Sequence, residues 1–315
     1  MKKVIVFLLS GFMLLCLSAA AEIDIVCSLF PQYDFTRHIA GERANVMKLL
    51  PHGVDSHDYE PSARDMVKCA EADMFIFTDE HLEGWISSLS ACLDGVHMVR
   101  CAEGIDLEAL QEEWESISEH DHEHEHETAS HMHTYDAHIW LDLTLSEIMC
   151  ENICAALSAY DPEGADYYEA NLNAYLMELR ALDAEFDALF HEYHESRLYF
   201  GGKFAYSHFL RRYGVQFESA YATCSDEGEP GIRTIIHMVD EMKETGAKVI
   251  FTDEMSSGEI ARAIAAQTGA ETKLFHTAHN LSARDAEKGL TFIDVMRMNL
   301  ANIESALGHA EGEHE

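Results

Sequence analysis

Positively charged residues are scarce in this sequence. Lys and Arg number 21 against 57 Asp and Glu in 315 residues, a formal net charge of -36 at pH 7 with histidine neutral. A field of this sign repels nucleic acid and attracts cations, so we expect no nucleic-acid partner. Acidity can equally serve to keep an exported protein in solution, so charge alone does not assign a function.

Long uninterrupted apolar runs are also missing. Beyond the N-terminus no segment approaches the roughly 18 apolar residues that suggest a spanning helix. Residues 1–21 start with two lysines, continue with the apolar run Val4–Leu17 and end in small residues, as a secretory signal peptide does. We therefore expect an exported, soluble protein, periplasmic or at the cell surface. Leu15 disfavours a lipid anchor on Cys16 without excluding one.

Two enzyme motifs are absent. The closest approach to H-E-x-x-H is "HEYHE" at residues 191–195, which has the wrong spacing. Gly202 and Lys203 lack the earlier glycine and the following Ser or Thr of a phosphate-binding loop, so any ATP hydrolysis must belong to a partner subunit. We expect no enzymatic activity.

Cysteines remain in an odd number if the signal peptide is removed. At least one thiol is then free, and pairing cannot be read from the sequence. Cys150 and Cys154 lie four residues apart on a predicted helix, a poor geometry for a disulfide, and are expected in the core. The seven are Cys27, Cys69, Cys92, Cys101, Cys150, Cys154 and Cys224.

Strand and helix patterns alternate along most of the chain. Apolar strands such as Met74–Phe77 precede helical patterns, and the rhythm returns in residues 246–276. This order predicts parallel sheets in two α/β lobes, over residues 22–160 and 197–308.

A long helix is predicted between the lobes, over residues 161–196. Its apolar residues alternate spacings of four and three, so they share one face, and Asp161 and Pro162 suit its start. A rod of about 45 Å could cross both lobes. The apolar face consists of Tyr168, Leu172, Tyr175, Leu179, Leu182, Phe186 and Leu189.

Histidines gather with acids in residues 119–133, and the tail 309–315 has the same character. No apolar face is available for burial, so a mobile surface loop is expected. Such a loop suits weak, exchangeable metal capture, because ordering it costs entropy, or it is simply a solvated acidic loop. Its histidines are His120, His122, His124, His126, His131 and His133.

Two other histidines occupy structured surroundings. "LLPHGVDSHDYEPSARDM" places His57 in a loop between a predicted strand and helix, the usual position of binding residues in a parallel sheet. "DAHIWLD" places His138 beside an apolar segment, with Asp136 and Asp142 available to fix its tautomer. Taken singly, each histidine could equally be a surface or capping residue.

Together with "LEGWI", the long helix and "FLRRYGV", these motifs resemble the metal-binding components of bacterial ABC importers, the cluster A-I solute-binding proteins. The resemblance covers nearly all the mature chain. It implies two α/β lobes joined by one long rigid helix, with a divalent metal in the cleft between them. By motif it makes His57 and His138 ligands, and the His-rich loop is typical of the zinc-binding branch.

The second lobe departs from that family pattern. Lys203 occupies the position of a histidine in zinc-binding relatives, and a protonated amine cannot ligate a cation. His276 and His279 follow a predicted strand at 272–275, where relatives carry an acidic ligand, and we expect them to replace the missing donor, His279 ahead of His276. One of them could instead serve only to cap the loop or to form hydrogen bonds within it. Left unassigned are Glu254, Cys224, Glu227 and Glu229.

The resemblance predicts a high-affinity extracytoplasmic receptor that carries Zn2+ as its transported ligand to an ABC permease with a separate ATPase. We expect a monomer with no membrane span in the mature chain. Alternatives are a manganese receptor of the same family, or a His-rich extracellular metal-storage or adhesion protein. Imidazole-rich ligation favours zinc, whereas carboxylates would favour manganese.

Overall fold

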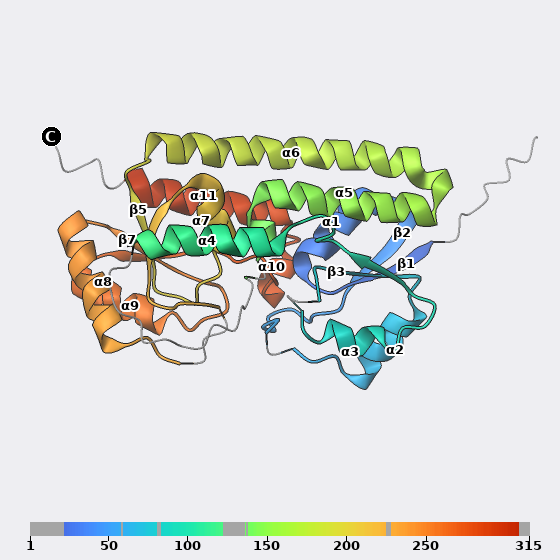
Figure 1. The fold of residues 1–315 in the computed structure, drawn as a ribbon, viewed down its shortest axis with the longest axis horizontal. Helices are drawn as coiled ribbons and strands as arrows, with labels where there is room; N and C mark the ends of the chain where they lie inside the picture. The colour runs from blue at the N-terminus through green and yellow to red at the C-terminus, as the bar shows by residue number, and fades with distance from the viewer. Residues whose placement is uncertain are drawn as a thin grey trace, which may run out of the picture.

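The computed structural model describes residues 22–57, 59–80, 83–121, 136, 138–224 and 228–308. The predicted signal peptide, the acidic tail and most of the His-rich loop lie outside the described residues. Two α/β lobes stand side by side, and helix α6 runs along one side of both (Figure 1). No helix in the described ranges combines the length and hydropathy needed to cross a membrane.

The first lobe is built on a four-stranded parallel sheet in the order β2-β1-β3-β4. The predicted strand Met74–Phe77 is confirmed as β3, and all four of its residues are buried, as expected of a central parallel strand. The other strands are β1 (Ile23–Cys27), β2 (Ala44–Lys48) and β4 (His97–Arg100). Its helices are α1 (Phe30–Ala40), α2 (Ala63–Glu71), α3 (Ile86–Ser90), α4 (Leu107–Asp121) and α5 (Leu143–Tyr160).

The second lobe repeats this plan with the strand order β6-β5-β7-β8, again all parallel. Its last strand begins and ends one residue earlier than the predicted 272–275. The strands are β5 (Arg197–Phe200), β6 (Gln216–Ser219), β7 (Val249–Thr252) and β8 (Glu271–Leu274). The helices are α7 (Ser207–Tyr213), α8 (Ile232–Thr245), α9 (Glu259–Thr268), α10 (Ala283–Glu287) and α11 (Phe292–Gly308).

Helix α6 (Ala165–Glu192) confirms the predicted long connector, and its 28 residues correspond to about 42 Å. Of the predicted apolar face, all residues are buried except Leu189, which is partly buried. A short 3-10 turn, η3 (Pro162–Gly164), precedes the helix, and Asp161 is its N-cap residue, as the sequence indicates. The Asp161 side chain makes no capping hydrogen bond, and its carboxylate accepts from Arg43 and Tyr168 instead.

Helices from each lobe also cross to the other. Trp114 of α4 stacks on Phe217 of the second sheet with ring centroids 5.3 Å apart. Phe292 of α11 lies edge-on against Phe35 of α1 at 4.9 Å. One apolar core therefore continues beneath α6 from lobe to lobe, and the lobes are held together by more than the connector.

Helix α4 continues to Asp121, so residues 119–121, which the sequence assigns to the mobile loop, are helical. Cys150 and Cys154 are free and buried on α5, as predicted.

Candidate metal centre

The candidate site lies where the carboxyl ends of both sheets face each other. His57 follows β2 of the first lobe, while Cys224 follows β6 and His279 follows β8 of the second. Loops at the carboxyl ends of parallel strands are where α/β proteins bind ligands. His138 arrives differently, directly before the 3-10 turn η2 (Ile139–Leu141) that leads into α5.

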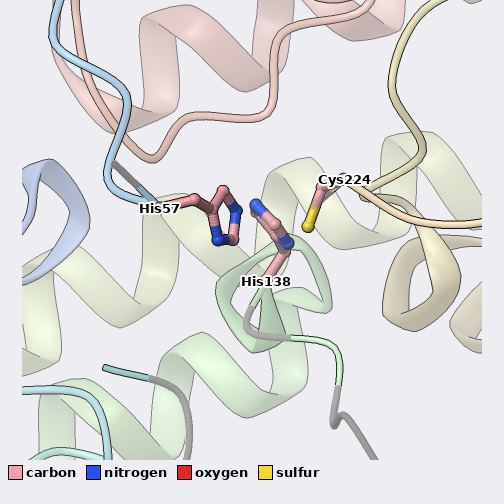
Figure 2. Close-up of side chains that lie close together, drawn as sticks. All are labelled: His57, His138 and Cys224. Carbon is pink, nitrogen blue, oxygen red and sulfur yellow. The ribbon is translucent and has the colours of Figure 1, made fainter. Parts of the chain in front are cut away.

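Three metal-ligating side chains converge there. His57, His138 and Cys224 each offer one ligand atom, and these atoms lie within 4.8 Å of one another. Figure 2 shows the two imidazoles and the sulfur turned toward a common space. The imidazole of His279 borders the group, with its ring centroid 5.5 Å from that of His138 and 6.2 Å from that of His57. Donors from both lobes therefore surround one point.

The orientation of His138 is set by Asp136. Nδ1 of His138 lies 2.7 Å from Oδ1 of Asp136, and the same oxygen accepts from the His138 main-chain N–H at 3.0 Å. A carboxylate at Nδ1 holds a proton there, so Nε2 is the nitrogen that a metal can bind, after displacing any proton on it. Nε2 of His138 is buried and makes no regular hydrogen bond within the described part of the chain.

Asp136 is itself anchored by the second lobe. Its carboxylate accepts from Ser207 Oγ, and its carbonyl lies 3.0 Å from Nε2 of His208. Burial raises the pKa of Asp136, but the charge and hydrogen bond of His138 outweigh it and bring the pKa well below its usual value. The carboxylate is therefore ionised at neutral pH.

The orientation of His279 is set through Thr277. The Thr277 hydroxyl donates to Oε1 of Glu254 at 2.6 Å, and Nδ1 of His279 contacts the same hydroxyl oxygen. Because the hydroxyl proton is directed at Glu254, Nδ1 must carry a proton and donate it, which leaves Nε2 as a lone pair. Burial first, and then the charges of His138 and His57, lower the pKa of His279 well below its usual value. It is a neutral imidazole, the form that ligates a metal.

His276 is engaged by its own loop. Its Nδ1 accepts from the Ala278 main-chain N–H at 2.9 Å and lies 3.2 Å from Oε1 of Glu254. Asn299 bonds both the main-chain N–H and the carbonyl of His276. Ala278 adopts φ 59°, the left-handed region that a non-glycine residue rarely adopts. Such strain is characteristic of loops that present functional side chains.

Cys224 and His138 influence each other's protonation. Burial raises the pKa of Cys224, but the charges of His138 and His57 lower it to about 7. Burial lowers the pKa of His138, but Cys224 and Asp136 raise it to about 10. At pH 8 without metal, Cys224 is therefore a thiolate and His138 an imidazolium. A bound cation would displace the proton of the His138 imidazolium.

Other candidates are not part of this group. The Lys203 main-chain N–H donates to Oδ2 of Asp253 at 2.9 Å, and its half-buried side chain offers no lone pair while protonated. Glu229 is exposed, and Glu227 lies outside the described residues. Of the loop histidines, His120 is in the last turn of α4 and the others fall outside the described residues.

Sequence reasoning includes Cys224 among the candidates of the second lobe but assigns it no role. Its position in the sequence could have indicated a role as a metal ligand. A cysteine in the loop after a strand of a parallel sheet lies at the carboxyl edge of the sheet, where α/β proteins bind ligands.

Comparison with known proteins places these features in a family. Residues 25–306 match the family model described as zinc-uptake complex component A, periplasmic. The high-affinity zinc uptake system protein ZnuA of Bacillus subtilis is 31% identical over 292 residues, covering 92% of this chain and 89% of that protein. The zinc-binding protein AdcA of Streptococcus pyogenes is 28% identical over 293 residues, covering 90% of this chain and 56% of AdcA. The chain thus spans a little over half of the latter relative.

Solved structures show the same fold. The metal-dependent lipoprotein YcdH from Bacillus subtilis superposes with a TM-score of 0.75 at 27% identity, covering 91% of this chain and 99% of that one. The Zn(II)-bound ZnuA-like domain of Streptococcus pneumoniae AdcA gives a TM-score of 0.74 at 24% identity with the same coverage, a likeness of fold alone.

Proposed function

The chain belongs to the family of periplasmic component A of zinc-uptake complexes, and from this premise we propose that it is a high-affinity extracytoplasmic receptor that delivers Zn2+ to an ABC permease. Zinc is the transported ligand, and the protein performs no chemistry on it. Three histidines, His138, His276 and His279, have a buried Nε2 without a hydrogen-bond partner among the described residues. The observation that carries this proposal is that two of them, His138 and His279, have their rings beside each other and beside His57.

We assign metal ligation to His57, His138 and His279. His138 and His279 are each held in the tautomer that frees Nε2, by a carboxylate and by a hydroxyl respectively. Zinc accepts three or four nitrogen or sulfur donors in a tetrahedral arrangement, so this set fits it. The Nδ1 contacts of His276 support a different role for that residue, which is to hold the loop that presents His279.

The two sides of the cleft are already joined by hydrogen bonds. Trp140 Nε1 donates to the Thr277 carbonyl at 2.8 Å, and the Asn280 side chain donates to the carbonyls of Pro51 and Val54. The donors are therefore held near one another before a metal arrives, and preorganisation of this kind raises affinity because less ordering is needed on binding.

The His-rich loop, with His120, His122, His124, His126, His131 and His133, is proposed as an accessory zinc-gathering segment. It leaves α4, whose Trp114 packs on the second lobe, and returns at Asp136, which bonds the ligand His138. The loop is therefore joined in sequence to the segment that carries the ligand His138.

Manganese transport and metal storage are less well supported. The converging donors are imidazoles, which favour zinc over manganese. A storage protein would need only the loop, whereas the buried Nε2 atoms of His138 and His279 lie in the folded cleft.

The family implies two partners, a membrane permease and its separate ATPase. We propose that the chain acts as a monomer, exported to the periplasm or the cell surface. A lipid anchor through Cys16 is the less favoured form, although relatives described as zinc-binding lipoproteins exist in Streptococcus pneumoniae.

Competition titration with a zinc chelator tests the proposal on a protein that lacks residues 122–133. We expect one tight zinc site to survive this deletion and to prefer zinc over manganese. His57→Ala, His138→Ala and His279→Ala should each weaken it by more than about tenfold. His194→Ala, whose side chain is exposed at the end of the connector, is the matched control and should bind as the parent does. Loss of all tight binding on loop deletion would instead identify a storage protein.

A further inference from the structure

Of the described cysteines, Cys224 is the one that lies next to the candidate metal ligands. Its Sγ lies within 4.8 Å of ligand atoms of both His57 and His138. In Figure 2 the sulfur points at the imidazole of His138. Five of the six other described cysteines are buried without a place in this cluster, and Cys92 is exposed on the first lobe.

The site also contains independent signs of a missing ligand. The imidazoles of His138 and His279 are almost fully buried, yet Nε2 of each has no nitrogen or oxygen hydrogen-bond partner among the described residues, and Cys224 is the neighbour of His138 there. Leaving such polar atoms unpaired costs about 1–3 kcal/mol each, and a cation placed among them would satisfy both. Cys224 completes their surroundings from the second lobe, across the cleft from His57.

We propose that Cys224 is a thiolate ligand of the transported metal, so that the cleft holds a donor set of one sulfur and histidine nitrogens. This inference rests on the proposed function, because it concerns the same site. Cys224 and His279 then bind from the second lobe, and His57 and His138 bind from the first. The second lobe thus supplies its donors without the side chain of Lys203.

The chemical consequence is a narrower choice of cargo. Thiolate is a soft donor that binds zinc and cadmium strongly, whereas manganese, calcium and magnesium prefer oxygen. A sulfur in the ligand set therefore excludes hard cations more firmly than imidazoles alone, and it admits cadmium as a competitor. The transported class is that of thiophilic divalent ions.

Cobalt substitution provides a direct test. The purified full-length mature protein, kept reduced, is loaded with one equivalent of Co2+, and its near-ultraviolet spectrum is recorded. We expect a thiolate-to-cobalt charge-transfer band in the parent and in Cys92→Ser, the matched control with an exposed thiol elsewhere. The band should vanish in Cys224→Ser and in Cys224→His, while Cys224→His still binds zinc tightly because imidazole can take the sulfur's place.

Two further readouts keep the test decisive if a variant folds poorly. X-ray absorption of the zinc-loaded parent should show one sulfur at about 2.3 Å together with nitrogens at about 2.0–2.1 Å. Cys224→Asp should narrow the preference for zinc over manganese by about tenfold or more, because a carboxylate suits manganese.

The outcomes separate this inference from the receptor function. A parent that binds zinc tightly but shows no sulfur in its absorption spectrum overturns the thiolate ligand and leaves the receptor intact. Persistence of the band in Cys224→Ser overturns it as well. A parent with no tight zinc site overturns both.

Discussion

Replacing Asp136 with asparagine tests whether the carboxylate prepares His138 for zinc. Asp136 is the partner of His138 Nδ1 at 2.7 Å, and it holds the imidazole with Nε2 turned to the site. Asparagine keeps the size of the side chain but removes the charge. Its amide can also present N–H2 to Nδ1, which would favour the opposite tautomer and place the proton on Nε2, where the metal must bind.

The size of the effect follows from the behaviour of such partners. Loss of a group that orients a metal-ligating histidine costs about 10–100-fold in affinity. At about 1.4 kcal/mol for each tenfold change, this corresponds to about 1.4–2.8 kcal/mol of zinc-binding free energy. The larger value is expected here, because Asp136 is ionised, partly buried and directly bonded to the ligand.

The assay is chelator competition at pH 7.5 with the parent, Asp136→Asn and the control Asp65→Asn. Asp65 belongs to the capping box of α2, so its replacement costs about 1 kcal/mol of folding stability. Its hydrogen-bond partners are Ser62, Lys68 and Tyr59, none of which is a proposed metal ligand. We expect the control to bind zinc as the parent does. Equal zinc affinity in Asp136→Asn and the parent would refute the proposed role of the carboxylate.

Three other predictions follow from the same structure. Leu179→Ala, at a fully buried position on α6, should lower the free energy of unfolding by about 2–5 kcal/mol in urea titrations. Met177→Ala, on the exposed side of the same helix, should change it by no more than about 0.5 kcal/mol. Similar losses in both variants would show that α6 does not pack through the assigned face. At pH 8 the pKa of Cys224, about 7, leaves it a thiolate while that of His138, about 10, keeps it protonated, so zinc should displace about one proton. Zinc affinity should then fall as the pH drops through 7 and the thiol regains its proton. Calorimetry in buffers of different ionisation enthalpy measures the number of protons released on zinc binding. Release of no proton would contradict the assigned thiolate and imidazolium pair. Thr277→Val removes the hydroxyl between Glu254 and His279 and should weaken zinc binding about tenfold. The control Thr268→Val, at the end of α9, should leave zinc binding unchanged. Unchanged affinity in Thr277→Val would mean that the hydroxyl does not set the His279 tautomer.

Much of the fold was predictable because its signals are local. The apolar periodicity of α6 and the continuous apolar run of β3 follow from side-chain spacing along one segment. The crossing of α4 and α11 between lobes was not predictable, because no local pattern says which neighbour an apolar face will meet. The partners of the Asp161 carboxylate were not predictable either, since Arg43 reaches it from a distant part of the chain and Tyr168 from α6.

The residues of the site also fall into a part that was predictable from local sequence and a part that was not. The sequence by itself determined the class of ligand and the candidates His57 and His138, because each lies in a short motif beside its own strand or turn. Only the tertiary structure shows that Cys224 lies beside them, that Thr277 contacts both Glu254 and His279, and that Nδ1 of His276 accepts from its own loop. Metal coordination requires donor atoms at one point in space, and in parallel sheets that point is assembled from strand ends far apart along the chain.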